Sequence, residues 1–422
     1  MILLFVAQFC GLDQAKPLLD SDLVIAWNQA VFRLAEEEDG LLTLKGVRCA
    51  AMMHVAIHDA LNRIEPKYAT YASSDRVEPV DPSVAAAFAA FSVVVNQYPD
   101  SLTELRELLV RTVESSENVS AAALLGKDSA ASVIKIREHD GWDSEAEYHF
   151  HPMGPGVYAE FSEHSNTPTG FVFGAGWAKA MPFMLPSQDH FRSPPPPDIQ
   201  SDAYTTAFRE VKEVGRDSST TRLDDQSHLA MWWKDFVENS HNRLARDLVS
   251  KHDLDMWRTA RLFALLNMSI YDAYVNVFDN KFYYNHWRPY TAIRWAEHDG
   301  NPETQADPSW NNLHHHTYAF PSYPSAHGTA SAAAMRVLED VFGKEFGFTM
   351  RTDKVDKAGP FSGKVSMDPP TRTFDSFSQA AMECSLSRVY LGIHFRYDSE
   401  EGYRLGRQIG TFGCTEFLTP VH

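Results

Sequence analysis

Apolar residues recur every three or four positions through most of this 422-residue chain, and this helical spacing is the feature that most constrains its fold. Apolar–polar alternation with a period of two, bounded by turn residues, is scarce. We therefore expect an all-α fold. The segments predicted to be helical are Ser21–Glu37, Leu44–Arg63, Pro82–Tyr98, Ser101–Ser115, Ala121–Asp140, Ala203–Val214, Gln226–Trp233, Asp255–Phe278, His327–Phe342, Asp375–Tyr390 and Ser399–Phe412.

The two halves of the chain resemble each other. Residues 52–60 (MMHVAIHDA) align without gaps to residues 265–273 (LLNMSIYDA), and each segment is followed by a helix that opens at Pro-Ser, at Pro82 and at Pro324. Residues 126–141 and 383–393 occupy comparable places further along. The pattern predicts two similar helical bundles packed together, with chance similarity between amphipathic helices as the alternative.

A Gly/Pro-rich middle segment separates the halves and ends in four consecutive prolines, Pro194–Pro197. Its many aromatic residues favour an ordered connection packed across the surface, with the prolines as a stiff strap, over a plain linker. We expect a single unit over residues 1–422. It would comprise a non-catalytic helical bundle (20–145), the connection (146–200) and a C-terminal bundle (201–422) whose motifs lie at 281–398.

Composition excludes several classes of protein. The formal net charge of −18 argues against a nucleic-acid partner, because phosphate contacts need clustered Lys and Arg. No apolar run reaches the roughly 20 residues of a transmembrane helix. Four cysteines lack metal-site spacing; one pair could form a disulfide, and the sequence does not say which. The apolar stretch Met1–Cys10 is either the remnant of a secretion signal or a docked or disordered end. We expect a soluble protein, secreted or periplasmic rather than cytoplasmic.

Basic and imidazole residues gather in three segments of the C-terminal third. Lys281 and Arg288 are seven residues apart, so both side chains reach the same side if one helix carries them. Pro289 should end that helix. A lysine and an arginine offer a point charge and a planar fork for separate oxygens of one anion.

The second segment, Pro324-Ser325-Ala326-His327, precedes an Ala-rich helix. Small residues at a helix N-terminus let backbone N–H groups approach an anion, and the helix dipole favours negative charge there. His327 could act as an acid or a base near neutral pH. An ordinary helix cap is the alternative for this segment taken alone.

The third segment carries Arg388 and His394 near a helix end expected around Gly392. His394 can offer one ring nitrogen as a nucleophile or ligand, while Asp398 is placed to hold the opposite ring N–H. Two other histidine groups are expected to be structural: residues 314–316 as a solvated loop, and His54 with His58 as packing residues without a zincin pattern.

Together the three segments resemble the signature shared by vanadium-dependent haloperoxidases and the type 2 phosphatidic acid phosphatase superfamily. That signature reads Lys, six residues, Arg-Pro; then Pro-Ser-Gly-His; then Ser-Arg, five residues, His. This chain departs from it once, with Ala326 in place of glycine. The segments Asn285–Arg294, Phe320–Ser325 and Tyr390–Asp398 look like the soluble haloperoxidase-like branch.

The resemblance implies a haloperoxidase/acid phosphatase-like fold and a role for each residue. Lys281, Arg288 and Arg388 would neutralise the oxygens of the anion, helped by Ser325 and the backbone N–H of Ala326. His394 would be the axial ligand of vanadium, or the nucleophile of a phosphatase, and His327 would be the acid–base group. Phe320 would line the halide pocket, where bromide-preferring enzymes carry histidine.

Two functions follow, and the same site serves both because vanadate mimics the phosphoryl transition state. The first is a vanadate-dependent haloperoxidase acting on hydrogen peroxide, halide and a small organic acceptor. The second is a phosphatase that uses a phosphohistidine and a phosphate ester, with no metal. A non-catalytic anion-binding protein is a third possibility that leaves the full set of cationic residues unexplained. A homodimer is expected by analogy with this branch.

Overall fold

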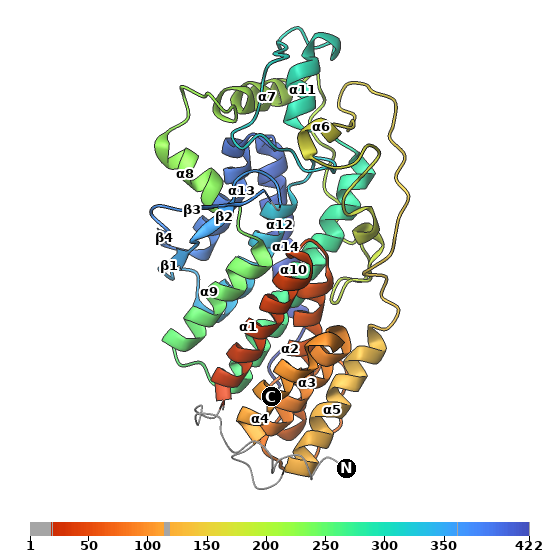
Figure 1. Ribbon diagram of the computed structural model, residues 1–422, viewed down its shortest axis with the longest axis vertical. Coiled ribbons are helices and arrows are strands. Elements are labelled where there is room, and N and C mark those ends of the chain that lie inside the picture. Colours follow the sequence, from red (N-terminus) through yellow and green to blue (C-terminus); the bar gives the residue numbers. More distant parts are fainter. Residues whose placement is uncertain (1–17, 19, 114–118, 361, 422) are drawn as a thin grey trace.

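The computed structural model describes residues 18, 20–113, 119–360 and 362–421, and it forms an elongated stack of helices (Figure 1). The all-α prediction is confirmed, with four short strands as the exception. The helices are α1 (Asp20–Asp39), α2 (Lys45–Ile64), α3 (Pro82–Gln97), α4 (Leu102–Val113), α5 (Val119–Ile136), α6 (Ser162–Ser165), α7 (Asp202–Val214), α8 (Asp224–Trp232), α9 (Val237–Lys251), α10 (Met256–Tyr284), α11 (Pro289–Trp295), α12 (Ala326–Phe342), α13 (Phe377–Leu391) and α14 (Arg396–Glu416).

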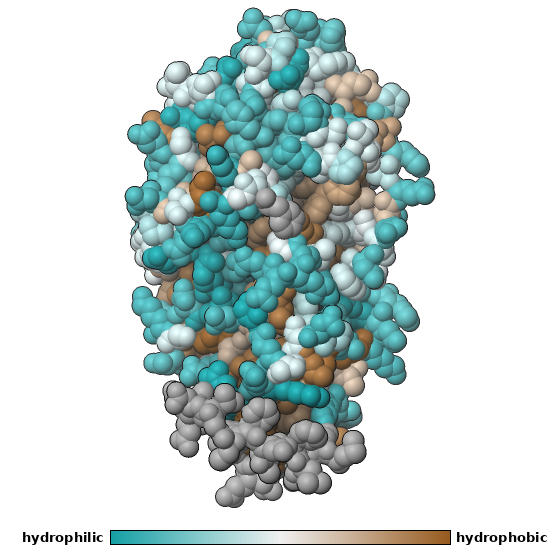
Figure 2. Space-filling model, in the orientation of Figure 1, coloured by the Kyte–Doolittle hydropathy of each residue, from teal (hydrophilic) through white to brown (hydrophobic). Residues whose placement is uncertain are grey.

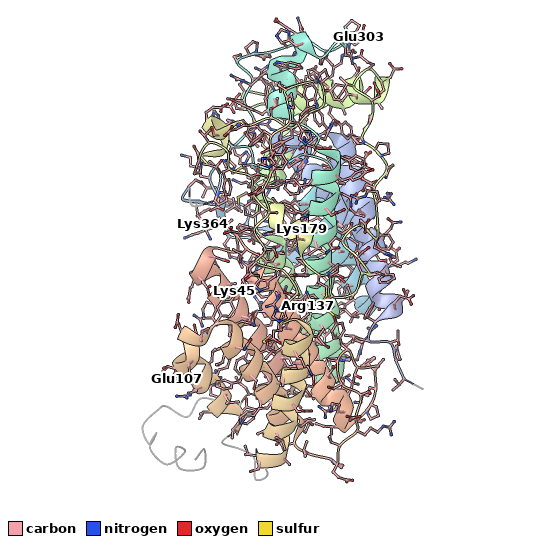
Figure 3. The ribbon with its side chains drawn as sticks, turned by 90° about the vertical axis from the view of Figure 1, so that its right-hand side faces the viewer. Lys45, Glu107, Arg137, Lys179, Glu303 and Lys364 are labelled. Carbon is pink, nitrogen blue, oxygen red and sulfur yellow. The ribbon has the colours of Figure 1, made fainter. Side chains whose placement is uncertain are left out.

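The strands form two small antiparallel pairs. β1 (Phe348–Arg351) pairs with β4 (Thr371–Phe374), and β2 (Lys354–Asp356) pairs with β3 (Lys364–Ser366). Lys364 donates to Glu36 of α1, which ties this hairpin to the N-terminal helices (Figure 3).

Two helices depart from the sequence expectation for one physical reason. α9 was not predicted, and its buried face carries the polar residues Ser240, His241 and Asn242. α10 continues six residues beyond the expected end, through Asn280 and Lys281, which are fully buried. In the first two turns of α9 and the last turns of α10, polar side chains fill core positions and interrupt the apolar periodicity, which α9 resumes from Leu244 to Val249.

The predicted similarity of the two halves appears in their hydrogen bonds. Asp59 of α2 accepts from three consecutive backbone N–H groups, those of residues 71–73. Asp272 of α10, its counterpart in the alignment, accepts from the N–H groups of residues 183–185. Each aspartate thus holds a three-residue backbone segment against its own helix in the same way. The prediction of two similar helical bundles is confirmed.

Close glycine contacts extend the comparison and correct one part of it. A Cβ at Gly126 of α5 would lie 2.2 Å from the carbonyl of Ala85 in α3. A Cβ at Gly406 of α14 would lie 2.1 Å from the carbonyl of Thr329 in α12. The packing therefore relates α5 to α14, whereas the sequence comparison had placed residues 126–141 against 383–393 in α13.

The connection is ordered and held in place by hydrogen bonds along its second half. Arg137, at the end of α5, donates to the carbonyls of Met181 and Pro182 (Figure 3). In the proline strap, the carbonyls of Ser193 and Pro194 accept from the hydroxyls of Tyr284 and Tyr323. The division into domains at residues 145 and 200 stays a prediction.

The outer surface is mostly hydrophilic on the face shown in Figure 2. Within the described ranges, no helix is both long and apolar enough to cross a membrane. Three cysteines, Cys49, Cys384 and Cys414, are buried free thiols, and burial raises the pKa of each to about 12. Cys10 and the rest of Met1–Cys10 lie outside the described residues.

Candidate active site

No single helix carries both Lys281 and Arg288: Lys281 lies in the last turn of α10, and Arg288 precedes α11. α10 ends at Tyr284 because Asn285 adopts a left-handed conformation, with φ of 48°. Arg288 is extended, as expected before a proline, and caps the N-terminus of α11. The reversal of the chain nevertheless brings the two cations to one place, because both hydrogen-bond to carbonyls of the segment 320–322.

Ser325 caps the N-terminus of α12, as the sequence predicted. Its hydroxyl oxygen accepts from the N–H of Gly328 at 3.3 Å, and the side chain is fully buried. Ala326 is the first residue of the helix. Gly402 of α14 packs so closely that a Cβ there would lie 2.6 Å from the carbonyl oxygen of Ser325. The turn is therefore fixed from behind, with the N-terminal end of the helix available to an anion.

Arg388 lies in the last turn of α13, and His394 follows the helix end. The helix stops where expected because Gly392 takes a φ of 83°. His394 lies in the turn before α14, with its ring almost fully buried.

Asp398 holds His394 in the predicted way. Its Oδ2 lies 3.0 Å from Nδ1 of His394 and accepts from the N–H of Phe395 at 3.1 Å. The Ser322 hydroxyl donates to the same oxygen. Nδ1 therefore carries the proton, and Nε2 is the ring nitrogen whose lone pair can serve as an acceptor or a ligand.

The arginines are each partly satisfied by the protein. Nε of Arg288 donates to the carbonyl of Phe320 at 2.8 Å, and Nη1 lies 3.0 Å from Nε2 of His394. Nη1 of Arg388 donates to the carbonyl of Trp233 at 3.1 Å. Nη2 of Arg288 and Nε of Arg388 are buried without a partner in the described part of the chain. Lys281 gives two hydrogen bonds to carbonyls of Pro321 and Ser322.

We call Lys281, Arg288, Ser325, Ala326, Arg388 and His394 the oxyanion cradle. Its three cationic side chains are at most 2% exposed. Among the residues that the structure describes, no carboxylate lies within ion-pair distance of any of the three. Asp398 favours the charged forms of Lys281 and Arg288 from beyond that distance, so one carboxyl group faces three cations. Burying several charges with incomplete compensation is costly, so this arrangement calls for an anion.

Burial governs the electrostatics of the cradle. It lowers the pKa of Lys281 well below its ordinary value, and it lowers that of Arg288 to about 10. The pKa of His394 is also lowered well below its ordinary value, by burial first and then by Arg288 and Lys281. His394 is therefore a neutral imidazole, the form that binds a metal.

This donor set fits a tetrahedral oxyanion such as vanadate. Unpartnered N–H groups on Arg288 and Arg388 point to missing acceptors, and a neutral imidazole nitrogen supplies a metal ligand. Backbone N–H groups at the start of α12 add further donors.

His327 lies at the edge of the cradle on the first turn of α12. Its ring is half-buried, and Nε2 has no partner among the described residues. Burial lowers the pKa of His327 well below its ordinary value, and Arg388 adds to this effect. With so low a pKa, the imidazole releases a proton soon after it accepts one. This behaviour suits a residue that transfers protons during a reaction.

A pocket of about 510 Å³ opens onto the cradle at Arg388 and His394. Phe320 lines it, as do His327 and Ala326. The Phe320 ring lies 4.6 Å from the guanidinium carbon of Arg288 and 5.1 Å from Nζ of Lys281. Phe320 thus separates the two cations from the pocket, and a role in halide binding remains a prediction.

The expectation of a solvated loop at residues 314–316 is wrong for two of the three histidines. The side-chain amide of Asn312 donates to the carbonyl of His316, and its oxygen accepts the N–H of the same residue. This turn sends His314 and His316 inward, each 4% exposed, and leaves His315 outside near Asp217. His54 and His58 are fully buried, as expected for packing residues.

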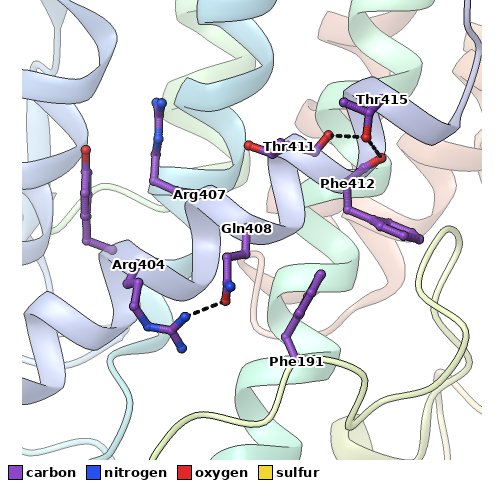
Figure 4. Close-up of a pocket in the computed structure, with 8 residues that line it drawn as sticks. Phe191, Arg404, Arg407, Gln408, Thr411, Phe412 and Thr415 are labelled. Atoms are coloured by element: carbon purple, nitrogen blue, oxygen red, sulfur yellow. Dashed lines mark hydrogen bonds between the residues drawn. The ribbon is translucent and has the colours of Figure 1, made fainter.

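A second, more open pocket lies on the outer side of α14 and does not meet the cradle (Figure 4). Phe191 and Phe412 line it together with Arg404 and Arg407. Both arginines are paired with carboxylates, Arg404 with Glu401 and Arg407 with Glu339. Because carboxylates already neutralise both arginines, this second pocket lacks the cations without an ion-pair partner that mark the cradle.

Sequence reasoning missed several residues at the site. Ser322 supports Asp398, and the carbonyl of Trp233 orients Arg388. Lys234 lines the pocket and donates to the carbonyls of Asp356 and Ala358, which holds the segment after β2 at the rim. Ser322 lies in the quoted Phe320–Ser325 segment and could have been found there. The others depend on tertiary contacts.

Comparisons with known proteins find chains that are similar over most of this length. Residues 261–420 match the family described as the VCPO second helical-bundle domain. The vanadium chloroperoxidase of Curvularia inaequalis is 23% identical, over 90% of this chain and 79% of that protein.

Solved structures share the fold. The crystal structure of a bacterial vanadium-dependent iodoperoxidase superposes with a TM-score of 0.75 at 23% identity, covering 96% of this chain and 99% of the other. The holo form of a bacterial vanadium-dependent chloroperoxidase gives a TM-score of 0.66 at 18% identity, over 88% of this chain and 91% of the other.

Proposed function

We propose that this chain, which is similar to vanadium-dependent haloperoxidases over most of its length, is a vanadate-dependent haloperoxidase. In this proposal it oxidises halide with hydrogen peroxide to hypohalous acid, which halogenates a small organic acceptor. The names of the similar proteins, chloroperoxidases and an iodoperoxidase, support this choice over a phosphatase.

One observation carries the proposal. Lys281, Arg288 and Arg388 are buried together without an ion-paired carboxylate in the described part of the chain, beside a neutral imidazole whose Nε2 lone pair faces Nη1 of Arg288. A site that bound an anion through charge alone would need only cationic residues. It would not place a neutral imidazole, which can be a metal ligand, beside them.

Each residue then has a defined task. His394 would hold vanadium through Nε2, while Asp398 keeps the proton on Nδ1. The three cations, the Ser325 hydroxyl and the Ala326 N–H would bind the vanadate oxygens. Bound vanadate would supply a Lewis acid that activates hydrogen peroxide toward halide. His327 would accept and return a proton at Nε2, the nitrogen that faces no protein partner.

The test uses the protein loaded with orthovanadate after removal of phosphate. Peroxide-dependent halogenation of a phenolic dye is measured with iodide, bromide and chloride, and hydrolysis of p-nitrophenyl phosphate is measured separately. We expect halogenation that requires vanadate and is lost in His394→Ala.

The phosphatase alternative makes the opposite prediction. Phosphate ester hydrolysis that vanadate inhibits, with no halogenation by the vanadate-loaded protein, would overturn the proposal. Intact vanadate binding by the His394→Ala variant would separately remove His394 from the role of metal ligand.

A further inference from the structure

The pocket continues beyond the cradle into an aromatic chamber. We use this name for the part lined by Phe173, Trp177, Glu238, Tyr274 and Phe278, together with Leu41 and Leu42 of the turn between α1 and α2. Its residues come from the connection, α9 and α10, which the fold brings together behind the cradle. The total volume of about 510 Å³ lies within the range of small-molecule sites.

One wall of the chamber is a continuous set of aromatic rings that reaches the cradle. The ring of Trp177 lies 5.0 Å from that of Phe173 and 4.9 Å from that of Phe278. Phe278 in turn lies 5.2 Å from Phe320, the residue that covers Lys281 and Arg288. Such a wall accepts a flat aromatic molecule by stacked and edge-to-face contacts, and it leads that molecule toward the anion.

A buried carboxyl group breaks this apolar lining. Glu238, the second residue of α9, is 4% exposed and lines the chamber. Its Oε2 accepts from the hydroxyl of Tyr274 at 2.6 Å. Within the described residues it forms no ion pair, and apart from Tyr274 its own backbone N–H is the group that hydrogen-bonds to it.

The charged groups that act on Glu238 are acidic. Burial raises its pKa to about 7, and Asp235 in the turn before α9 and Asp39 at the end of α1 add to that rise. The hydrogen bond from Tyr274 opposes it. A carboxyl group of this kind changes its protonation near neutral pH, the range in which a general base is most useful.

We propose that Glu238 binds the hydroxyl group of an aromatic acceptor whose ring lies against Trp177 and Phe278, which makes electron-rich phenols the preferred substrates of the pocket. The inference rests on the proposed function for its halogenating agent, hypohalous acid. Donation of the phenol O–H to a carboxylate raises the electron density of the ring, which favours attack on an electrophilic halogen.

The reaction balances without another reagent. The ring carbon forms a bond to halogen, the halogen–oxygen bond of hypohalous acid breaks, and the departing hydroxide takes up the ring proton to give water. Glu238 holds the phenol proton during the attack and returns it to the oxygen afterwards. The products are a halophenol and water.

Binding can be measured without vanadate, peroxide or halide. We choose 2-naphthol and naphthalene as probes, because they differ by one hydroxyl group, and follow tryptophan fluorescence of the protein at pH 8. We expect 2-naphthol to bind on the order of tenfold more tightly than naphthalene, from one hydrogen bond to a charged group. Glu238→Gln should lower this ratio to below about threefold and leave the affinity for naphthalene unchanged.

Two controls protect the interpretation. Asp247→Asn changes an exposed carboxylate on the same helix and should behave like the wild type. The binding ratio of the wild type should also rise between pH 5.5 and pH 8 as Glu238 loses its proton, whereas that of Glu238→Gln should stay constant. Thermal unfolding of both variants shows whether they remain folded.

Each result decides the question. Equal ratios for the wild type and Glu238→Gln overturn the inference, whatever the halogenation assay gives. A Glu238-dependent preference for 2-naphthylmethylamine over 2-naphthol overturns the assignment to phenols in favour of cationic amines. If the expected ratios appear but the vanadate-loaded protein does not halogenate, the proposed function fails while the binding role of Glu238 stands.

Discussion

Replacement of Asp398 tests how the cradle holds its metal ligand. The carboxylate accepts from His394, Phe395 and Ser322 through one oxygen, Oδ2, while Oδ1 is buried without a partner in the described chain. In Asp398→Asn the amide oxygen can keep all three hydrogen bonds, with the amide nitrogen in the place of Oδ1. The geometry then survives and the negative charge behind His394 is lost. Asp398→Ala loses both the hydrogen bonds and the negative charge.

Partners of metal-bound histidines contribute about tenfold to 100-fold in metal affinity. We therefore expect the Kd for orthovanadate to rise about tenfold in Asp398→Asn and about 100-fold in Asp398→Ala, or roughly 1.4 and 2.7 kcal/mol. The affinity is measured by calorimetric titration of the phosphate-free protein. The stabilisation by vanadate in thermal unfolding provides a second measurement.

Asp272→Asn is a matched control. Asp272 is also fully buried and also accepts three hydrogen bonds, but they come from the backbone of residues 183–185. This variant should lose stability and keep its affinity for vanadate. Equal affinities for the wild type and both Asp398 variants would refute the orienting role, and an equal loss in Asp272→Asn would show that the effect is a general loss of packing.

Three further outcomes are expected. His327→Ala should bind vanadate within about threefold of the wild type and lose at least 100-fold in kcat for halogenation, because its proton transfer acts in turnover. Ser325→Asp should weaken binding of vanadate and phosphate alike in titration, because it places a carboxylate at the N-terminus of α12. The folded pKa of Glu238, about 7, exceeds the ordinary value of 4.5, so its protonated form is favoured by folding. The free energy of unfolding should therefore fall by roughly 3 kcal/mol between pH 4.5 and pH 7, in urea titrations relative to Glu238→Gln.

Most helices and all the residues of the cradle could be predicted from the sequence, but for different reasons. Helices with an apolar inner face, such as α7, have the periodicity that predicts them. The cradle could be predicted because its motifs are specific. The spacing of Lys281 and Arg288 alone did not decide their local structure, because it could not show that the left-handed Asn285 ends α10 between them.

The aromatic chamber could not be predicted from any one segment. Trp177, Glu238 and Tyr274 lie in the connection, α9 and α10, and they meet through tertiary packing alone. Glu238 also lies in the first turn of α9, where buried polar residues interrupt the apolar spacing that this helix shows from Leu244 onward.

The similarity of the two bundles helps to explain why the cradle lies in the second one. The helices α3 and α12 begin at corresponding places, but their caps differ. Asp81 caps α3, and its carboxylate accepts from the N–H groups of Ser83 at 2.9 Å and Val84 at 3.2 Å. That N-terminus therefore already has a negative charge, which repels an external anion. Ser325 caps α12 with a neutral hydroxyl, so the positive end of the helix dipole remains available beside the three buried cations. A single cap residue thus separates a structural helix end from one that can take part in anion chemistry.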